Sequence, residues 1–279
     1  MGINHMENKR FESMIAVITG AGGVLCSEFA RHLAAEGAAV AVVDLREDAA
    51  KAVADEITAA GGRAIAVAAN CLDEASLLAA RETIVAALGT PNVLINGAGG
   101  NNPKGSTNDE FYDAEGTKTF FDLDSEGIRF VMDLNLMGAL LPTKVFAKDM
   151  IGKDAVILNV SSMNAFRPLT KIPAYSSAKA AVSNLTQWLA VYFAKSGIRV
   201  NAIAPGFFVT NQNRALLFNE DGTPTPRTDK ILANTPMGRF GEADELLGTL
   251  DWLLDNRTSG FVTGIVVPID GGFSAYSGV

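Results

Sequence analysis

Two side chains near the middle of the chain, Tyr175 and Lys179, have types and a spacing that could move a proton. Residues four apart lie on the same face of a helix, one turn from each other. An ammonium at that position favours the phenolate and lowers the pKa of a tyrosine from its reference value of about 10. Tyr175 could then exchange a proton with an alcohol–ketone pair at neutral pH. Ser162 could hydrogen-bond the same oxygen if it ends a strand beside that helix.

The Tyr-x-x-x-Lys spacing also fits an ordinary amphipathic helix with both residues on its surface, because so short a motif often occurs by chance. The chemical interpretation therefore depends on the elements that position these residues.

Composition excludes several other classes of protein. The chain has 279 residues, of which 48% are hydrophobic and 19% charged, as is typical of a globular protein with a sizeable core. A formal net charge of −8 argues against nucleic acid and anionic membranes as partners. No uninterrupted apolar run reaches the roughly 18 to 20 residues of a membrane span. With no secretory signal in the sequence, we expect a cytoplasmic location.

The cysteines and histidines argue against a metal site and a hydrolase. Cys26 and Cys71 offer neither a disulfide framework nor a metal-ligand spacing, so we expect reduced thiols and no metal. A Ser-His-Asp hydrolase requires a histidine base held by a carboxylate. His5 lies in the amino-terminal tail, and we expect His32 to be a solvated helix residue. A Gly-x-Ser-x-Gly elbow is also absent.

A nucleotide-binding unit begins near the amino terminus. An apolar run over 14–19 predicts a buried strand, which leads into Gly20-Ala21-Gly22-Gly23 and a helical pattern over 24–36. A second strand over 39–43 ends at Asp44. The N–H groups of such a turn suit a pyrophosphate, and an acid at this distance suits the ribose hydroxyls. For the glycines alone, a tight turn without a ligand is the alternative.

Strands and helices continue to alternate along the chain. We expect further strands over 63–69, 93–95, 155–160, 199–204 and 265–269, and helices over 47–60, 76–88 (with Asp73 as N-cap), 124–150, 175–196 and 243–254. This order predicts one doubly wound α/β Rossmann domain over 14–279, behind a loose tail over 1–13 that could include an expression remnant.

Right-handed crossovers would bring the carboxyl ends of the strands to one edge of the sheet. Asp44, Asn96, Ser162 and Pro205 all fall at such ends. Two long polar segments, 101–123 and 207–236, also follow strand ends, and we expect both to be substrate loops.

Together these motifs resemble those of the short-chain dehydrogenase/reductase family. They are Thr19-Gly20 with its glycine turn, Asn96-Gly97-Ala98-Gly99, Asn135, Ser162, Tyr175-x-x-x-Lys179 and Pro205-Gly206. The resemblance covers the chain from about Met14 to the end. It implies a seven-stranded parallel Rossmann sheet, a nicotinamide cofactor and a homo-oligomer, with a tetramer favoured and a dimer possible.

The resemblance also implies residue roles. Tyr175 would protonate the carbonyl oxygen as hydride arrives, Lys179 would lower the pKa of the tyrosine and bind the nicotinamide ribose, and Ser162 would orient the substrate oxygen. Asn135 would hold a water that links Lys179 to solvent, although an asparagine bonded to helix backbone is an alternative. The implied cofactor-binding residues are Gly20, Gly22, Gly23, Val24, Leu25, Asp44, Asn70, Cys71, Asn96, Ala98, Gly99, Tyr175, Lys179, Pro205, Gly206, Phe208 and Thr210.

Four positions depart from the family pattern. The family usually has glycine where Val24 and Cys26 stand. Because a β-branched residue at positive φ is strained, we expect Val24 to be helical already, and Cys26 to be small enough for close helix–strand packing. Gly97 replaces a second asparagine, a change that we expect to loosen nothing essential. Asn70 replaces an aspartate that faces the adenine, and its amide can still form that hydrogen bond.

A narrower resemblance, carried by residues 22–27, 95–101, 204–208 and 275–279, is to the branch of D-mannonate oxidoreductases, or fructuronate reductases. It implies hydride transfer between nicotinamide and a sugar acid, D-fructuronate or D-mannonate. Asp44 would repel a 2′-phosphate and favour NAD(H), while the nearby Arg46 weakens that preference. A polyol or other sugar-alcohol dehydrogenase of the same family is the first alternative. A non-catalytic nucleotide sensor is the second, but it would not need the Ser-Tyr-Lys trio.

A sugar carboxylate requires a cation or several N–H donors in the site. Besides Ser162, the candidate substrate residues are Asn101, Arg167, Lys171, Asn211 and Arg214. Each of them could instead be a solvated loop residue. Arg167 and Lys171 rank first because they lie between the serine and the tyrosine in the sequence.

Overall fold

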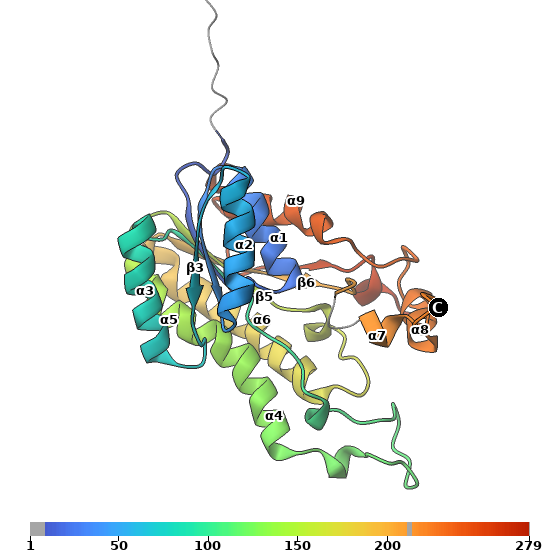
Figure 1. The fold of residues 1–279 in the computed structure, drawn as a ribbon. Coiled ribbons are helices and arrows are strands. Elements are labelled where there is room, and N and C mark those ends of the chain that lie inside the picture. Colours follow the sequence, from blue (N-terminus) through green and yellow to red (C-terminus); the bar gives the residue numbers. More distant parts are fainter. Residues whose placement is uncertain (1–8, 211–213, 279) are drawn as a thin grey trace, which may run out of the picture.

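Seven parallel strands form one sheet in the order β3-β2-β1-β4-β5-β6-β7, as the Rossmann prediction requires (Figure 1). The computed structural model describes residues 9–210 and 214–278. The strands are β1 (Ile15–Thr19), β2 (Ala39–Asp44), β3 (Arg63–Ala68), β4 (Val93–Asn96), β5 (Ala155–Val160), β6 (Ile198–Pro205) and β7 (Val266–Ile269). Both faces of the central strands are buried, which explains their nearly continuous apolar runs.

Helices cover both faces of the sheet. They are α1 (Val24–Ala35), α2 (Glu47–Ala59), α3 (Glu74–Leu88), α4 (Ser125–Met132), α5 (Gly138–Met150), α6 (Pro173–Phe193), α7 (Arg214–Leu217), α8 (Pro226–Ala233), α9 (Leu247–Leu254) and α10 (Asn256–Ser259). Helices α1, α2 and α9 pack on one face around a core that includes Phe29 and Leu250. Helices α3, α5 and α6 pack on the other around Ile84 and Phe146.

A π-helical turn, Asp133–Met137, joins α4 to α5 in one continuous helix. The stretch Ser125–Met150 is long and apolar enough to cross a membrane by length and composition alone. Half of its most apolar window is buried inside the domain, and α5 packs against α3 and the sheet. It is therefore explained as a core helix of this fold.

The amino-terminal prediction is wrong from residue 9 onward. Phe11 is only 1% exposed, and its N–H donates to the carbonyl of Glu36 at 2.9 Å. Arg10 forms ion pairs with Asp251 and Asp255, both at 3.1 Å. An aromatic ring inside the core and a guanidinium between two carboxylates hold this segment against the domain.

His32 also differs from its prediction as a solvated helix residue. Its Nε2 lies 2.7 Å from Oδ1 of Asp251, and its side chain is 20% exposed. The contact joins α1 to α9, so this histidine has a structural partner far from the carboxyl ends of the strands.

Three helical segments begin or lie where the sequence did not place them. Helix α6 begins at Pro173, two residues before the predicted start, which puts Tyr175 in its first turn. The segment 207–236, expected to be irregular, contains α7 and α8. Helix α8 begins at Pro226. Thr225, the residue before it, caps the helix, because its hydroxyl accepts from the N–H of Thr228.

Candidate active site

Parallel pairing aligns the ends of the central strands. Thr19 pairs with Asn96, and Asn96 with Asn159, so β1, β4 and β5 end at one edge of the sheet. The hydroxyl of Thr19 accepts from the N–H groups of Gly97 and Ala98, at 3.1 and 3.3 Å. The glycine turn after β1 and the turn after β4 are thereby held side by side.

Ser162, Tyr175 and Lys179 meet at this edge. Ser162 follows β5 directly and forms a hydrogen bond with Tyr175 on α6. One turn further along α6, Lys179 is 4% exposed, and its Nζ donates to the carbonyl of Val160 at 2.8 Å. The same Nζ lies 5.7 Å from the centre of the Tyr175 ring. The sequence interpretation of these three residues as one group is therefore matched by the geometry.

The pKa of Tyr175 differs from its prediction. Burial lowers the pKa of Lys179 to about 8. Burial also raises the pKa of Tyr175, with the hydrogen bond to Ser162 opposing that rise. The expectation that Lys179 lowers the tyrosine pKa is not met, because desolvation of the phenolate is the largest influence and the Lys179 ammonium donates to the carbonyl of Val160. A protonated Tyr175 suits the role of acid.

Asn135 lies in the π-helical turn and bonds only to backbone. Its Nδ2 donates to the carbonyls of Gly100 and Val131, at 2.7 and 2.8 Å, and its Oδ1 accepts from the N–H of Gly100 at 3.2 Å. A Cβ added to Gly99 would lie 2.7 Å from that oxygen and 3.1 Å from Nζ of Lys179. The structure thus shows the backbone-bonded alternative, and the water-holding role stays a prediction.

The glycine turn has the features of a nucleotide cradle. Gly20 has a φ of +65°, and an added Cβ there would lie 2.9 Å from the backbone of the turn after β4. Helix α1 begins with no side-chain cap, so its first N–H groups face outward as an anion site requires. Val24 is its first residue and has a negative φ, which confirms that expectation.

Asp44 lies at the end of β2, beside this turn. One carboxylate oxygen accepts from the N–H of Gly22 at 2.9 Å, and the other accepts from the N–H of Arg46 at 3.0 Å. The carboxylate is thereby fixed where a ribose would lie, and the residues present fit a dinucleotide. The Arg46 guanidinium is 3.8 Å from the carboxylate and exposed.

Other predicted cofactor residues are distributed around the same edge. Asn70 is exposed and accepts from the N–H of Leu72, which leaves its amide group as a donor. Cys71 is 8% exposed, and burial raises the pKa of its thiol to about 11. Leu25 and Thr210 are partly buried.

Asn96 lies in a buried network under the turn after β4. It is 2% exposed, and its Nδ2 donates to Thr143 Oγ1 and Asn159 Oδ1. Its Oδ1 has no hydrogen-bond partner among the described residues, and its contact with a cofactor stays a prediction. At the end of β6, Gly206 fits closely against β7, because a Cβ there would lie 2.6 Å from Cα of Asp270.

A family model described as short chain dehydrogenase matches residues 14–220. The chain belongs to the short-chain dehydrogenase family. This dehydrogenase is 59% identical to an uncharacterized oxidoreductase from Haemophilus influenzae over 281 residues, 99% of either chain. It is 55% identical to the uncharacterized oxidoreductase UxuB of Bacillus subtilis, over 95% of this chain and 96% of that one.

Among solved structures, this dehydrogenase is similar to a provisionally named D-mannonate oxidoreductase from Haemophilus influenza with bound NAD. The two are 60% identical, superimpose with a TM-score of 0.94, and match over 98% of this chain and 99% of that one. Family membership makes this protein an oxidoreductase that uses a nicotinamide cofactor.

Two of the dehydrogenase's predicted substrate cations follow Ser162 in the sequence, and each contacts a different segment, Arg167 through its side chain and Lys171 through its backbone. Arg167 is exposed and donates to the carbonyl of Ser274 at 3.1 Å. Lys171 has a φ of +72°, a left-handed conformation that costs about 1–2 kcal/mol, and its carbonyl accepts from Thr107. Arg167 thus touches the carboxyl-terminal segment, and Lys171 the segment 101–123.

The remaining substrate candidates, where described, contact neighbouring residues of their own segments. Asn101 is exposed and donates to Ser106 Oγ at 3.3 Å. The Arg214 guanidinium lies 5.6 Å from the centre of the Phe218 ring. Asn211 lies outside the described residues. A carboxylate site built from these residues stays a prediction.

Sequence reasoning missed Asn164. It is 4% exposed, and its N–H donates to Ser162 Oγ at 3.3 Å. Among the described residues its Oδ1 has no hydrogen-bond partner. A buried amide with an unsatisfied oxygen, two residues after Ser162, is a candidate for substrate contact. Its proximity to Ser162 in the sequence was the available signal.

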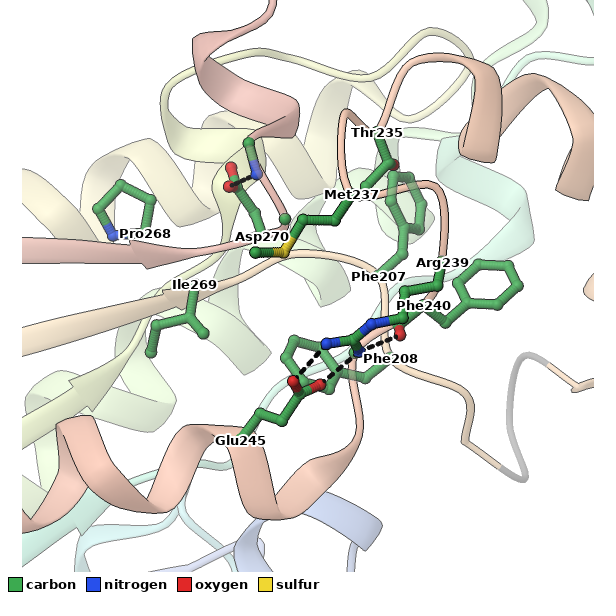
Figure 2. Close-up of a pocket in the computed structure, with 13 residues that line it drawn as sticks. Phe207, Phe208, Thr235, Met237, Arg239, Phe240, Glu245, Pro268, Ile269 and Asp270 are labelled. Atoms are coloured by element: carbon green, nitrogen blue, oxygen red, sulfur yellow. Dashed lines mark hydrogen bonds and ion pairs between the residues drawn. The ribbon is translucent and has the colours of Figure 1, made fainter.

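A cavity of about 450 Å³ lies between the ends of β6 and β7 and the segment before α9 (Figure 2). Phe207, Phe208, Met237 and Asp270 contribute to its lining, whereas the Ser-Tyr-Lys trio does not. Arg239 and Glu245, which also line the cavity, form a paired contact with each other. In the part of the chain that the structure describes, no three His, Cys, Asp or Glu side chains group as a metal site would require.

Proposed function

We propose that this dehydrogenase transfers a hydride between NAD(H) and a sugar acid, with D-fructuronate and D-mannonate as the ketone and alcohol. The observation that carries the proposal is the placement of Ser162, Tyr175 and Lys179 beside a nucleotide cradle with an acid at the ribose position. The similarity to an NAD-bound D-mannonate oxidoreductase supports the choice of substrate.

The chain's own residues fit the proton transfer. When bound, the nicotinamide supplies or accepts the hydride. Tyr175, whose pKa is raised by burial, donates its proton to the carbonyl oxygen during reduction, and in oxidation its phenolate form accepts the proton of the alcohol hydroxyl. The Ser162 hydroxyl, hydrogen-bonded to Tyr175, orients that oxygen and stabilises charge developing on it. Lys179 carries its positive charge below pH about 8.

A preference for NAD(H) is part of the proposal. The Asp44 carboxylate is anchored by two backbone N–H groups, so it stays where the 2′-phosphate of NADP(H) would have to lie. Arg46 is exposed and could partly offset that repulsion.

A homo-oligomer in the cytoplasm, a tetramer rather than a dimer, stays a prediction. Trp188, Val191 and Tyr192 on α6 are 58%, 81% and 64% exposed, which supports an interface at that helix.

The test is NADH oxidation, followed by the loss of near-ultraviolet absorbance, with keto-uronates and matched neutral ketoses as substrates and NADPH in parallel. We expect turnover with D-fructuronate and NADH. Turnover of neutral ketoses alone would overturn the sugar-acid proposal and favour the polyol alternative. Equal rates with NADPH would overturn the cofactor preference.

A further inference from the structure

We propose that Cys26 and Gly97 form a matched pair that positions Lys179 and Asn135 against the glycine turn. A Cβ built on Gly97 would lie only 2.1 Å from Sγ of Cys26, far inside any real contact distance. Cys26 is 5% exposed and lies on the first turn of α1. Its thiol therefore occupies the volume that any side chain at position 97 would enter.

Both positions depart from the family pattern in side-chain size, and they do so in opposite directions. The family usually has glycine at 26 and asparagine at 97, whereas this chain has a side chain at 26 and none at 97. We expect Gly97 to loosen nothing essential, because the Cys26 thiol fills the space that a side chain at position 97 would otherwise occupy. Gly97 does not have a positive φ, so contact rather than backbone strain excludes a side chain there.

The turn after β4 connects this pair to the catalytic residues. Gly97 and Ala98 are bonded to Thr19, and the next residue, Gly99, leaves no room for a Cβ between Asn135 and Lys179. A displacement of residue 97 would therefore shift the backbone that packs against the lysine ammonium.

Cys26 acts here by volume and not by charge. Burial raises the pKa of its thiol to about 12, so the thiol is neutral at working pH. Cys26 is accordingly a positioning residue. The inference rests on the dehydrogenase chemistry of the site but not on the identity of the sugar acid.

The test compares Gly97→Ala, Cys26→Gly and the double variant with the wild type, by NADH affinity and Tm. We expect Gly97→Ala to weaken NADH binding at least tenfold and to lower Tm. The double variant should recover most of the NADH affinity and of the Tm, because the Cys26 thiol is no longer there. The recovery should be incomplete, because the new Cβ would still lie 2.8 Å from the backbone oxygen of Thr19. Gly248→Ala on α9, where an added Cβ meets nothing within 4 Å, is the matched control.

A pH profile separates positioning from simple destabilisation. Lys179 is charged below about pH 8 and neutral above it, so kcat/KM for NADH should fall as pH rises through that value. In Gly97→Ala, a displaced and better solvated Lys179 has a higher pKa, so the falling limb moves to higher pH. The double variant should move it back.

The proposal would be overturned if the losses of NADH affinity and Tm were additive in the double variant. It would also be overturned if Gly97→Ala folded and its kcat/KM fell at the same pH as in the wild type. If Gly97→Ala does not fold, a folded double variant supports the pair, and an unfolded one overturns it because Thr19 would then be the obstacle. NADH affinity and Tm are measured without substrate, so a failure of the sugar-acid proposal would leave this test intact.

Discussion

The cofactor edge of this dehydrogenase and its predicted substrate segments, 101–123 and 207–236, are built in opposite ways. At the cofactor edge, close backbone approaches fix the geometry: Gly20 against the turn after β4, Gly22 against Asp44, and Gly97 against Cys26. The segment 101–123 has two short 3₁₀ turns and exposes Phe111 and Phe121 by 84% and 80%. It reaches the segment 207–236 through an ion pair between Glu110 and Lys230.

The difference shows where specificity can vary. A Cβ added at Gly20, Gly22 or Gly97 would lie less than 3 Å from a neighbouring atom, so few substitutions are allowed there and the cofactor edge can be recognised from short motifs. The ion pair between the two segments is exposed and screened by solvent, so these segments can be altered without loss of the fold. Three substitutions, ordered by expected effect, test this contrast.

Tyr175→Phe removes the proton donor and keeps the ring. Loss of general acid catalysis lowers kcat by about 10²–10⁴-fold, whereas NADH affinity should change little because the phenol faces the substrate oxygen. The measurements are single-turnover NADH oxidation and NADH fluorescence titration. Tyr276→Phe, at an exposed ring near the carboxyl terminus, is the control. Retention of more than a tenth of wild-type kcat would refute the role of Tyr175 as the acid.

Asp44→Asn removes the negative charge at the ribose position and nearly preserves shape. One of the two backbone N–H bonds is lost as well, because an amide group cannot accept it. We expect the kcat/KM ratio of NADPH to NADH to rise about tenfold, which corresponds to about 1.4 kcal/mol. Asp48→Asn, exposed in the first turn of α2, should leave the ratio unchanged. An unchanged ratio in Asp44→Asn would mean that this carboxylate does not select the cofactor.

Glu110→Gln breaks the ion pair with Lys230 between the two substrate segments. Lys230 holds the pKa of the Glu110 carboxyl below its usual range, so the pair is intact at neutral pH. We expect KM for the sugar acid to rise less than about fivefold, and the difference from wild type to shrink at high salt. Glu115→Gln, exposed in the same segment, is the control. A rise in KM above tenfold would show that the predicted substrate segments tolerate substitutions as poorly as the cofactor edge does.

The sequence predicted the sheet and the cofactor edge because the relevant signals are local. Apolar runs predicted the strands, glycines predicted the turns, and the acid at the end of β2 predicted the ribose site. The side-chain contacts of Asn96 were missed because its partners, Thr143 and Asn159, lie 47 and 63 residues away. The raised pKa of Tyr175 was missed because burial depends on the whole fold. Substrate residues were hardest, because exposed loop side chains have no periodicity to reveal their direction.

The contacts of Arg10 have a consequence for the order of assembly during synthesis. Its partners Asp251 and Asp255 follow it by 241 and 245 residues. The strands β1 and β2 and the helix between them can pair as soon as they leave the ribosome. The outer side of α1 nevertheless stays uncovered until α9 has been synthesised, because Asp251, the partner of His32 and Arg10, lies on α9. Until nearly the whole chain has been made, the nucleotide unit therefore exposes an apolar surface that invites association with other chains.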